Sequence, residues 1–188
     1  MQALTYDNPA LMIIDMQNDG LDMIPTGKNI ITPINTILEC CRHKHVPIIF
    51  KLRVQRKDGI DVEKFRIELF KKKPFLVDGT TGANVVKELQ PKCDEYIVKG
   101  TRFSGFFQTD LQLILTRLGI KTLIICGMQT PNCIRATVTD ALAYDYQVVL
   151  VRDAVAAQTE QVHEANLFDM MNMGVEIVYV NEVVSKLR

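Results

Sequence analysis

Six short apolar runs recur along the chain, and they constrain its fold more than any other feature. In chain order they read ALMIID, VPIIFKL, EYIVKG, TLIICGM, QVVLVRD and VEIVYV. Hydrophobic and polar residues do not alternate cleanly within these runs, which is typical of strands that are covered on both faces. We therefore expect six strands in one sheet, with helices packed against both of its sides.

Helix-like segments lie between most of the runs, at 29–45, 82–90, 107–118, 131–144 and 160–173. In 107–118, the apolar residues fall near helical spacing and form one face. Strands that alternate with helices predict a parallel sheet. The 188 residues suffice for one α/β domain, 1–188, with its own core, and no internal repeat or linker interrupts it.

Residues 53–81 are the least regular part of the chain, and we expect a loop with a short helix there. Long excursions in α/β proteins often border the ligand site, but a purely structural excursion is equally consistent with the sequence. Both interpretations remain open at this point.

Composition and charge narrow the class of protein. The chain has 22 basic and 22 acidic residues and a formal net charge of zero, which does not favour nucleic acid or an anionic membrane as a partner. No apolar stretch approaches the roughly 20 residues of a membrane helix, and the N-terminus does not resemble a signal peptide. We expect a cytoplasmic protein with reduced thiols, because its five cysteines show neither disulfide nor zinc spacing.

Three residues that follow or close strand runs carry chemistry. Asp15 ends the first run, Lys99 lies near the end of the third, and the fourth run leads through a turn to Cys133. In a parallel α/β sheet, ligands bind outside the carboxyl ends of the strands, so we expect these side chains to meet. Each also has a structural interpretation: Asp15 as a turn cap, Lys99 as a solvent-facing residue, Cys133 as a small core residue.

The turn before Cys133 suits a reactive thiol. Thr130 is a good N-cap residue and Pro131 suits the first helical position, which places Cys133 in the first turn of a helix. The positive end of the helix dipole there favours a thiolate, and free backbone N–H groups can hold an oxyanion.

No histidine is a good candidate base for this thiol. None of the three histidines (His43, His45 and His163) closes a strand run, and His163 is best interpreted as a surface or boundary residue of a helix. Asp15 is then the expected base. Lys99 would stabilise the anionic state and lower the pKa of the thiol.

Three blocks of the sequence resemble a known family. LMIIDMQNDG, IVKGTRFSGFFQTDL and CGMQTPNCIRATVTDALAYDY resemble, in order and spacing, the isochorismatase-like cysteine hydrolases, which include nicotinamidases, N-carbamoylsarcosine amidohydrolases and ureidoacrylate amidohydrolases. The resemblance implies a Rossmann-like α/β/α sandwich with strand order 3-2-1-4-5-6. It also implies an Asp–Lys–Cys triad at Asp15, Lys99 and Cys133. A cis peptide between Met128 and Gln129 would aim the N–H groups of Gln129 and Cys133 at the oxyanion.

Departures from the family pattern restrict the activity. Nicotinamidases hold a metal with histidines after the second strand, but FKLRVQRKDGIDVEKFR contains none, so we expect no metal or other cofactor. Vinyl-ether isochorismatases have a glycine-type residue where Cys133 stands. The resemblance therefore favours a homo-oligomeric, metal-independent hydrolase that cleaves an amide or ureido C–N bond of a small molecule, other than a peptide bond, through a thioester. The alternative is a non-catalytic metabolite-binding or oligomerising protein of the same fold.

Candidate substrate-binding residues lie near the expected site. They are Gln17, beside Asp15, the arginines Arg53, Arg56 and Arg102, and the aromatic residue Phe103. An arginine can form a bidentate pair with a substrate carboxylate, although each of these three is also consistent with a surface position.

Overall fold

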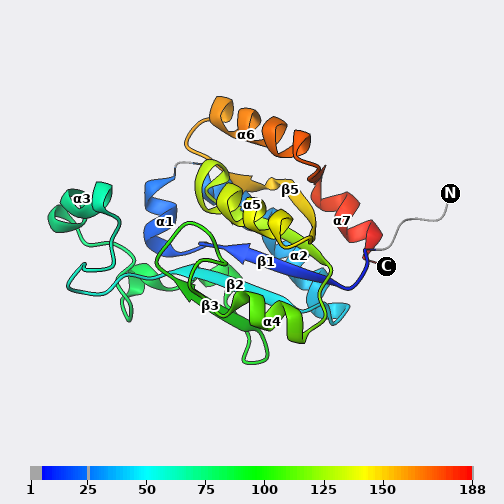
Figure 1. Ribbon diagram of the computed structural model, residues 1–188, viewed down its shortest axis with the longest axis horizontal. Coiled ribbons are helices and arrows are strands. Elements are labelled where there is room, and N and C mark those ends of the chain that lie inside the picture. The colour runs from blue at the N-terminus through cyan, green and yellow to red at the C-terminus, as the bar shows by residue number, and fades with distance from the viewer. Residues whose placement is uncertain (1–5, 25, 188) are drawn as a thin grey trace.

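One six-stranded parallel sheet forms the centre of the molecule (Figure 1). The computed structural model describes residues 6–24 and 26–187. The strands are β1 (Pro9–Ile14), β2 (Ile48–Arg53), β3 (Tyr96–Gly100), β4 (Thr122–Met128), β5 (Gln147–Ala156) and β6 (Glu176–Val178). Their order in the sheet is β3-β2-β1-β4-β5-β6, and every neighbouring pair is parallel. All six predicted strands and their order are confirmed.

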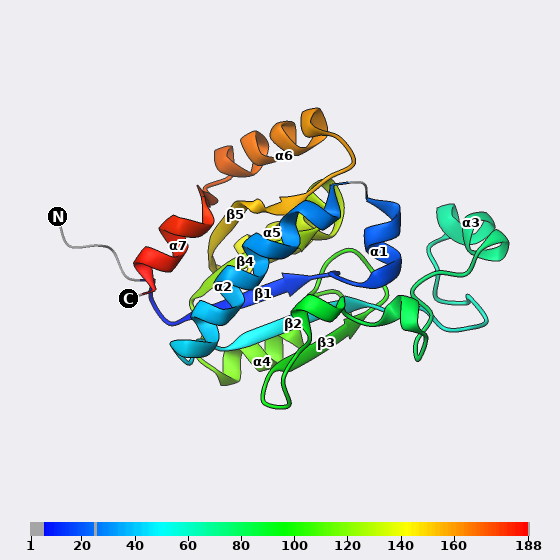
Figure 2. The ribbon, with the colours of Figure 1, turned by 180° about the vertical axis from the view of Figure 1, so that it is seen from behind.

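Helices cover both faces of this sheet, as Figures 1 and 2 show from opposite sides. Helices α2 (Ile31–His43) and α7 (Val180–Lys186) pack on the face formed by Leu11 and Ile13. Helices α4 (Leu111–Arg117), α5 (Arg135–Ala143) and α6 (Glu160–Asn172) pack on the face formed by Met12 and Ile14. The predicted α/β/α sandwich is therefore confirmed. No helix in the described part of the chain combines the length and apolar character needed to cross a bilayer.

Two predicted helices differ from the structure. Residues 82–90 hold only the 3-10 turns Thr81–Ala83 and Lys87–Leu89, because Val85 pairs its backbone with Gln17 in an antiparallel bridge. The predicted helix at 107–118 begins only at Leu111. Gln108 adopts a positive φ of 53°, which is incompatible with a right-handed helix, and Phe107 is left 51% exposed.

Residues 54–78 form an arm that projects from one end of the sheet (Figures 1 and 2). The arm contains a 3-10 turn, Lys64–Arg66, and helix α3 (Ile67–Lys72), so the expected loop with a short helix is confirmed. It has a small core of its own, made of Val62, Phe70, Phe75 and Leu76. The short helix α1 (Asn18–Met23) follows β1 beside the base of this arm.

The carboxyl ends of β1 and β4 approach each other very closely. Gly127 has a φ of 117°, and a Cβ atom there would lie 2.1 Å from the carbonyl oxygen of Ile14. Only glycine fits such a backbone approach. Asp15, the residue after Ile14, has a φ of 53°. This is a left-handed conformation that aspartate tolerates better than most residues. This local geometry brings Asp15 beside the turn that leaves β4.

Candidate active site

A buried ion pair lies at the carboxyl ends of β1 and β2. The Lys51 ammonium, which is 0% exposed, donates to both carboxylate oxygens of Asp15, at 2.9 and 3.1 Å, and to the carbonyl oxygen of Arg102 at 3.2 Å. An ammonium group has three protons, so Lys51 has one acceptor for each. Asp15 is itself only 7% exposed. The pair therefore fixes the orientation of a carboxylate in a site from which water is largely excluded.

Lys99, the lysine that the resemblance implied, lies elsewhere. Successive side chains of a strand point to opposite faces, and Lys99 is in register with Leu52, whereas Lys51 is in register with Ile14 and Val98. The Lys99 ammonium pairs with Asp78 at 2.9 Å, and its side chain is 53% exposed. The predicted grouping of Asp15, Lys99 and Cys133 is thus corrected: the ammonium beside Asp15 comes from Lys51.

Cys133 lies in a turn of π-helix, Thr130–Ile134, between β4 and α5. The peptide bond between Met128 and Gln129 at the start of this turn is cis, at the position that the resemblance implied. The N–H groups of Asn132 and Ile134 both donate to the carbonyl oxygen of Gln129, at 3.0 and 3.2 Å. The Asn132 side-chain amide donates to the Gln129 side chain at 2.9 Å. These bonds hold the turn in which the thiol is placed.

The Cys133 thiol is protonated in the resting site. Burial and the adjacent Asp15 carboxylate raise the pKa of the thiol to about 12, against the opposing effect of the Lys51 and Arg53 charges. The adjacent carboxylate thus disfavours a second negative charge on the sulfur. These surroundings do not favour the preformed thiolate that we expected, because the residue is only 6% exposed and a carboxylate lies beside it.

A layer of arginine and phenylalanine side chains covers this cluster. The Arg53 guanidinium carbon lies 4.8 Å from the centroid of the Phe103 ring, and that of Arg66 lies 5.3 Å from the same centroid. Arg53 is 2% exposed and pairs with Glu63 of the arm. Burial and the charge of Arg53 lower the pKa of Arg66. Glu63, Cys133 and Asp15 act in the opposite direction and partly offset this lowering. The arm therefore borders the candidate site, and Phe103 lies there against Arg53 and Arg66.

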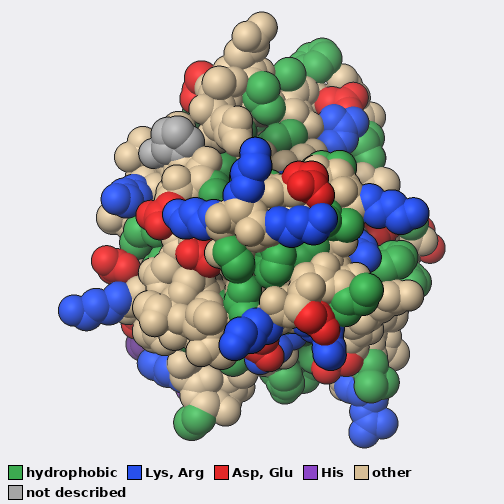
Figure 3. Space-filling model, turned by 90° about the vertical axis from the view of Figure 1, so that its left-hand side faces the viewer, with side chains coloured by type: hydrophobic (Ala, Val, Ile, Leu, Met, Phe, Trp, Pro, Cys, Tyr) green, Lys and Arg blue, Asp and Glu red, His purple; other side chains and the backbone are tan. Residues whose placement is uncertain are grey.

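Cationic side chains also gather on the surface around the arm. Figure 3 looks onto the end of the molecule from which the arm projects, and lysine and arginine side chains lie across the middle of that face. The exposed lysines of the arm are Lys57, Lys64, Lys71, Lys72 and Lys73. Their combined field attracts anions toward this end of the sheet.

The Gln17 side chain is engaged in hydrogen bonds to the backbone and has a structural role. Its side-chain amide donates to the carbonyl oxygens of Arg53 and Ala83, at 2.9 and 2.7 Å, and accepts from the Arg53 N–H at 2.9 Å. The residue is 0% exposed. Its expected contact with substrate is corrected, since these three bonds occupy the amide in joining the ends of β1 and β2 to the 3-10 turn at Thr81–Ala83.

Two of the three candidate arginines do not face the cluster. The Arg56 side chain is 68% exposed and lies 3.4 Å from Asp58 in an ion pair within the arm. The Arg102 guanidinium donates to the carbonyl oxygen of Asp61 at 2.6 Å, so it fastens the arm to the loop after β3. These two expectations are corrected, and Arg53 remains as the candidate that lies at the site.

Three residues at or near the cluster were missed in the sequence. Lys51 interrupts the apolar run VPIIFKL, and a charged residue inside a strand that is covered on both faces was the available signal. Arg66 had no signal, because its position depends on how the arm folds back. His163 is 9% exposed and contacts Thr130 by a hydrogen bond across 33 residues, which no local pattern reveals.

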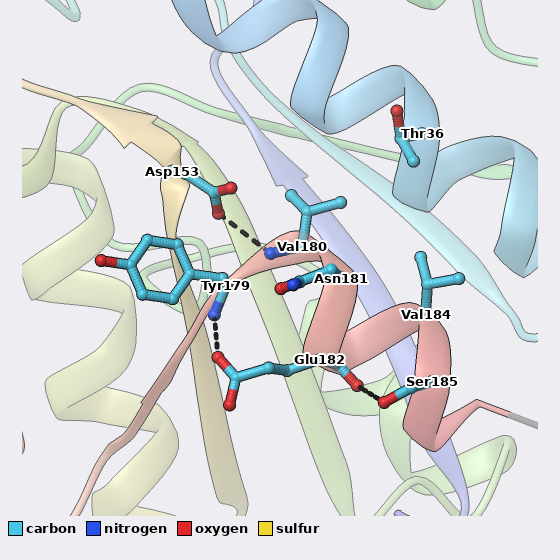
Figure 4. Close-up of a pocket in the computed structure, with 8 residues that line it drawn as sticks. All are labelled: Thr36, Asp153, Tyr179, Val180, Asn181, Glu182, Val184 and Ser185. Atoms are coloured by element: carbon cyan, nitrogen blue, oxygen red, sulfur yellow. Dashed lines mark hydrogen bonds between the residues drawn. The ribbon is translucent and has the colours of Figure 1, made fainter.

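A separate cavity of about 810 Å³ lies between α2, α7 and the end of β5 (Figure 4). Asp153 accepts a hydrogen bond from the Val180 N–H at 3.0 Å, and Glu182 accepts one from the Tyr179 N–H at 2.8 Å. These acidic groups are used to cap α7. None of the residues around Cys133 lines this cavity. The described residues contain no group of three or more His, Cys, Asp or Glu side chains that could hold a metal ion.

Comparisons with known proteins agree with this fold. A family model described as an isochorismatase domain matches residues 9–182. A protein of Arabidopsis thaliana named probable inactive nicotinamidase is 39% identical over 186 residues, which cover 94% of this chain and 95% of that protein. Nicotinamidase 3 of the same plant is 32% identical, and the aligned region covers 86% of this chain and 79% of that protein. The crystal structure of an isochorismatase family protein from Desulfovibrio vulgaris superposes with a TM-score of 0.92, at 38% identity, over 96% of this chain and 98% of that chain. The chain therefore belongs to the isochorismatase family of hydrolases.

Proposed function

We propose that the protein hydrolyses the C–N bond of a small anionic amide or ureido compound, with Cys133 as nucleophile and Asp15 as general base and acid. The observation that carries this proposal is the buried Asp15 carboxylate, whose charge acts on the Cys133 thiol and which Lys51 holds at 2.9 Å. A buried carboxylate that faces a neutral thiol is positioned to remove its proton. The family's amide-hydrolysing relatives support the same reaction class.

Acylation begins when Cys133 Sγ attacks the carbonyl carbon of the bound amide and its proton passes to Asp15. The pKa of the thiol, raised to about 12, means that attack and proton transfer occur together rather than from a standing thiolate. The N–H groups of Gln129 and Cys133 hold the developing oxyanion. The C–N bond then breaks, Asp15 returns the proton to the leaving nitrogen, and a thioester on Cys133 remains.

Deacylation uses the same residues in reverse roles. Asp15, again a carboxylate, removes a proton from a water molecule that attacks the thioester carbonyl carbon. The C–S bond breaks, and the proton on Asp15 returns to the sulfur, which regenerates the thiol. Lys51 keeps the carboxylate in place through both half-reactions, because all three of its donors are engaged in the resting site.

The charges at the site favour an anionic substrate. Three cationic side chains, Lys51, Arg53 and Arg66, surround the cluster, whereas Asp15 and Glu63 supply two carboxylates. Among the described residues Arg66 forms no ion pair, and the charge of Arg53 disfavours the charged form of Arg66. A substrate carboxylate between the two guanidinium groups would relieve this repulsion and form charge-assisted hydrogen bonds. The Phe103 ring would pack against the flat carbon skeleton.

A screen for released ammonia tests this proposal. Each candidate acid amide or ureido acid is paired with its uncharged methyl ester, and the purified protein and its Cys133→Ala variant are assayed with both. We expect turnover of at least one anionic compound, weak turnover of its ester, and none by Cys133→Ala. In Arg66→Gln, KM should rise roughly 10-fold or more with kcat little changed, because a lost substrate charge contact weakens binding. Equal rates with acid and ester would contradict the anionic substrate.

A non-catalytic binding protein is the second candidate function. It is favoured by the relative named probable inactive nicotinamidase, which is 39% identical, and by the surface position of Lys99. That candidate predicts that an anionic amide raises the thermal unfolding midpoint but is recovered unchanged after long incubation. Ammonia release that depends on Cys133 would exclude it.

A further inference from the structure

A polar contact joins the Cys133 turn to helix α6. Thr130 is the first residue of the π-helical turn and is 0% exposed. Its Oγ1 atom lies 3.0 Å from Nδ1 of His163, a residue of α6 that is 9% exposed. The contact spans the space between the catalytic turn and the outer helix layer, at a position three residues before the thiol.

The groups around His163 define how this contact works. Glu160 and Glu164 of its own helix and the Arg152 guanidinium of β5 are the charged groups near the imidazole. Arg152 and Glu164 form an ion pair at 2.6 Å, so their charges are directed at each other. Burial lowers the pKa of His163, which favours the neutral ring. In the neutral tautomer that carries its proton on Nε2, the ring presents Nδ1 as an acceptor for the Thr130 hydroxyl.

The turn and α6 are fastened by other contacts as well. Arg135, at the start of α5, donates to Asn166 of α6 at 2.9 Å and pairs with Asp169. Leu167 and Met170 of α6 are buried in the core beneath. The packing of α6 against α5 therefore does not depend on His163. What the Thr130–His163 contact adds is the orientation of one buried side chain at the start of the turn.

We propose that His163 is a positioning residue, which acts through Thr130 to hold the turn that carries Cys133 and the Gln129 amide in the geometry required for nucleophilic attack. The ring touches neither the thiol nor the place of the substrate. A displacement of the turn by a fraction of an ångström would separate Cys133 from Asp15 and turn the oxyanion donors away from the carbonyl group. The role of His163 in nucleophilic attack rests on the proposed function, whereas its restraint on the turn does not.

Substitutions at both partners, each with a conservative counterpart, test this inference. Thr130→Val and His163→Leu remove the hydrogen bond with little change in size. Thr130→Ser keeps the hydroxyl, and His163→Asn keeps an acceptor near the place of Nδ1. Thr122→Val is the matched control, because Thr122 is also 0% exposed, and its hydroxyl donates to the Asp7 carbonyl oxygen at the opposite end of β4.

The first measurement is the rate at which iodoacetamide alkylates Cys133, followed by mass spectrometry of its peptide with exposed Cys93 as internal reference. A loosened turn exposes a thiol that is now 6% exposed, so we expect alkylation to accelerate about fivefold or more in Thr130→Val and His163→Leu. Thr130→Ser, His163→Asn and Thr122→Val should stay within about twofold of the wild type. Wild-type rates in both Thr130→Val and His163→Leu would overturn the inference.

The second measurement is steady-state kinetics with the amide identified in the ammonia screen. In Thr130→Val and His163→Leu, kcat should fall about 10-fold or more while KM changes little, since orientation and not substrate binding is lost. An unchanged kcat would overturn the inference even if alkylation accelerates. If the wild-type protein hydrolyses no amide, the proposed function fails, and the alkylation rates alone decide whether His163 restrains the turn.

Discussion

Lys51 and Lys99 lie on neighbouring strands, and the two-residue period of a strand assigns them to opposite faces of the sheet. Lys51 is in register with Val98 of β3, and Lys99 is in register with Leu52 of β2. A motif comparison finds a lysine at the end of β3 but does not record the face to which its side chain points. Asp15 and Cys133 could be predicted from the sequence because each lies in a turn that follows a strand. Their direction does not depend on how side chains alternate between the two faces of the sheet.

Substitution of the two lysines should therefore have opposite consequences. Lys51→Met leaves the Asp15 carboxylate buried without its cation, so we expect the free energy of unfolding to fall by about 3–5 kcal/mol and amide hydrolysis to be lost. Lys99→Met breaks only an exposed pair with Asp78 and should cost at most about 1 kcal/mol, with near-normal activity. Urea denaturation and ammonia release measure both effects. A fully stable Lys51→Met variant, or an inactive Lys99→Met variant, would show that the assignment is wrong.

The raised pKa of Cys133 predicts how its reactivity depends on pH. Because the thiol titrates at about 12, the alkylation rate of Cys133 should be low near neutral pH and increase tenfold per pH unit up to the highest pH at which the protein stays folded. The rate is measured with brief iodoacetamide pulses and peptide mass spectrometry, in the wild type and in Asp15→Asn. Loss of the Asp15 charge should increase the rate at every pH. Rapid alkylation of the wild type well below pH 8 would contradict the account.

At the scale of elements, sequence patterns predicted the strands and helices that depend on local composition. They did not predict local structure that depends on contacts with distant parts of the chain. The six strand runs are apolar and well separated, and each forms a strand. Residues 82–90 have the composition of a helix, but their backbone is used by contacts with Met16 and Gln17 after β1. The short helices α1 and α7 have too few residues for a periodic pattern to be recognised.

The junction made by Gln17 gives a test at this scale. Gln17→Ala leaves the Arg53 N–H and the carbonyl oxygens of Arg53 and Ala83 without their partners, so we expect a loss of stability of about 3 kcal/mol or more. Because β2 ends in Arg53, kcat/KM should fall as well. Gln161→Ala is the control, an exposed glutamine on α6, and should change stability by less than about 0.5 kcal/mol. Equal effects of the two substitutions in urea denaturation would refute this role of Gln17.

At the scale of the whole molecule, buried thiols set the alkaline limit of stability. Burial raises the pKa of Cys41 and of Cys133 to about 12 and also raises that of Cys126, from a usual value of 9.0 in each case. Above about pH 9 the unfolded chain releases these protons while the folded protein retains them. The stabilisation is therefore complete below pH 9 and is lost progressively as the pH rises toward 12.

Urea denaturation between about pH 7 and 11 measures this loss. The free energy of unfolding should be nearly constant up to about pH 8.5 and then fall, and the fall should be shallower in Cys41→Ala, which has one buried thiol fewer. Exposed Cys93→Ala is the matched control and should leave the slope unchanged. A stability that rises with pH above 9 would show that the pKa values of the buried thiols are not raised on folding.

Self-association remains a prediction at this scale. The arm presents three strongly exposed apolar side chains, Ile60 at 79%, Phe65 at 71% and Leu69 at 54%. Contiguous exposed apolar surface commonly marks a protein contact, and we expect a homo-oligomer in which the arm is covered. Sedimentation equilibrium of the wild type and of Leu69→Lys measures this. A wild-type protein that stays monomeric at high concentration would exclude it.

The central claim is that Cys133 forms a thioester with an amide substrate. The most direct measurement mixes the protein with an excess of an anionic amide, quenches the reaction in acid within the first turnover and determines the intact mass and the modified peptide. We expect an added acyl mass on the peptide that contains Cys133, with ammonia released in equal amount, and neither product in Cys133→Ala. Ammonia release by Cys133→Ala at the wild-type rate, or a folded wild-type protein that acquires no acyl group from any anionic amide tested, would contradict it.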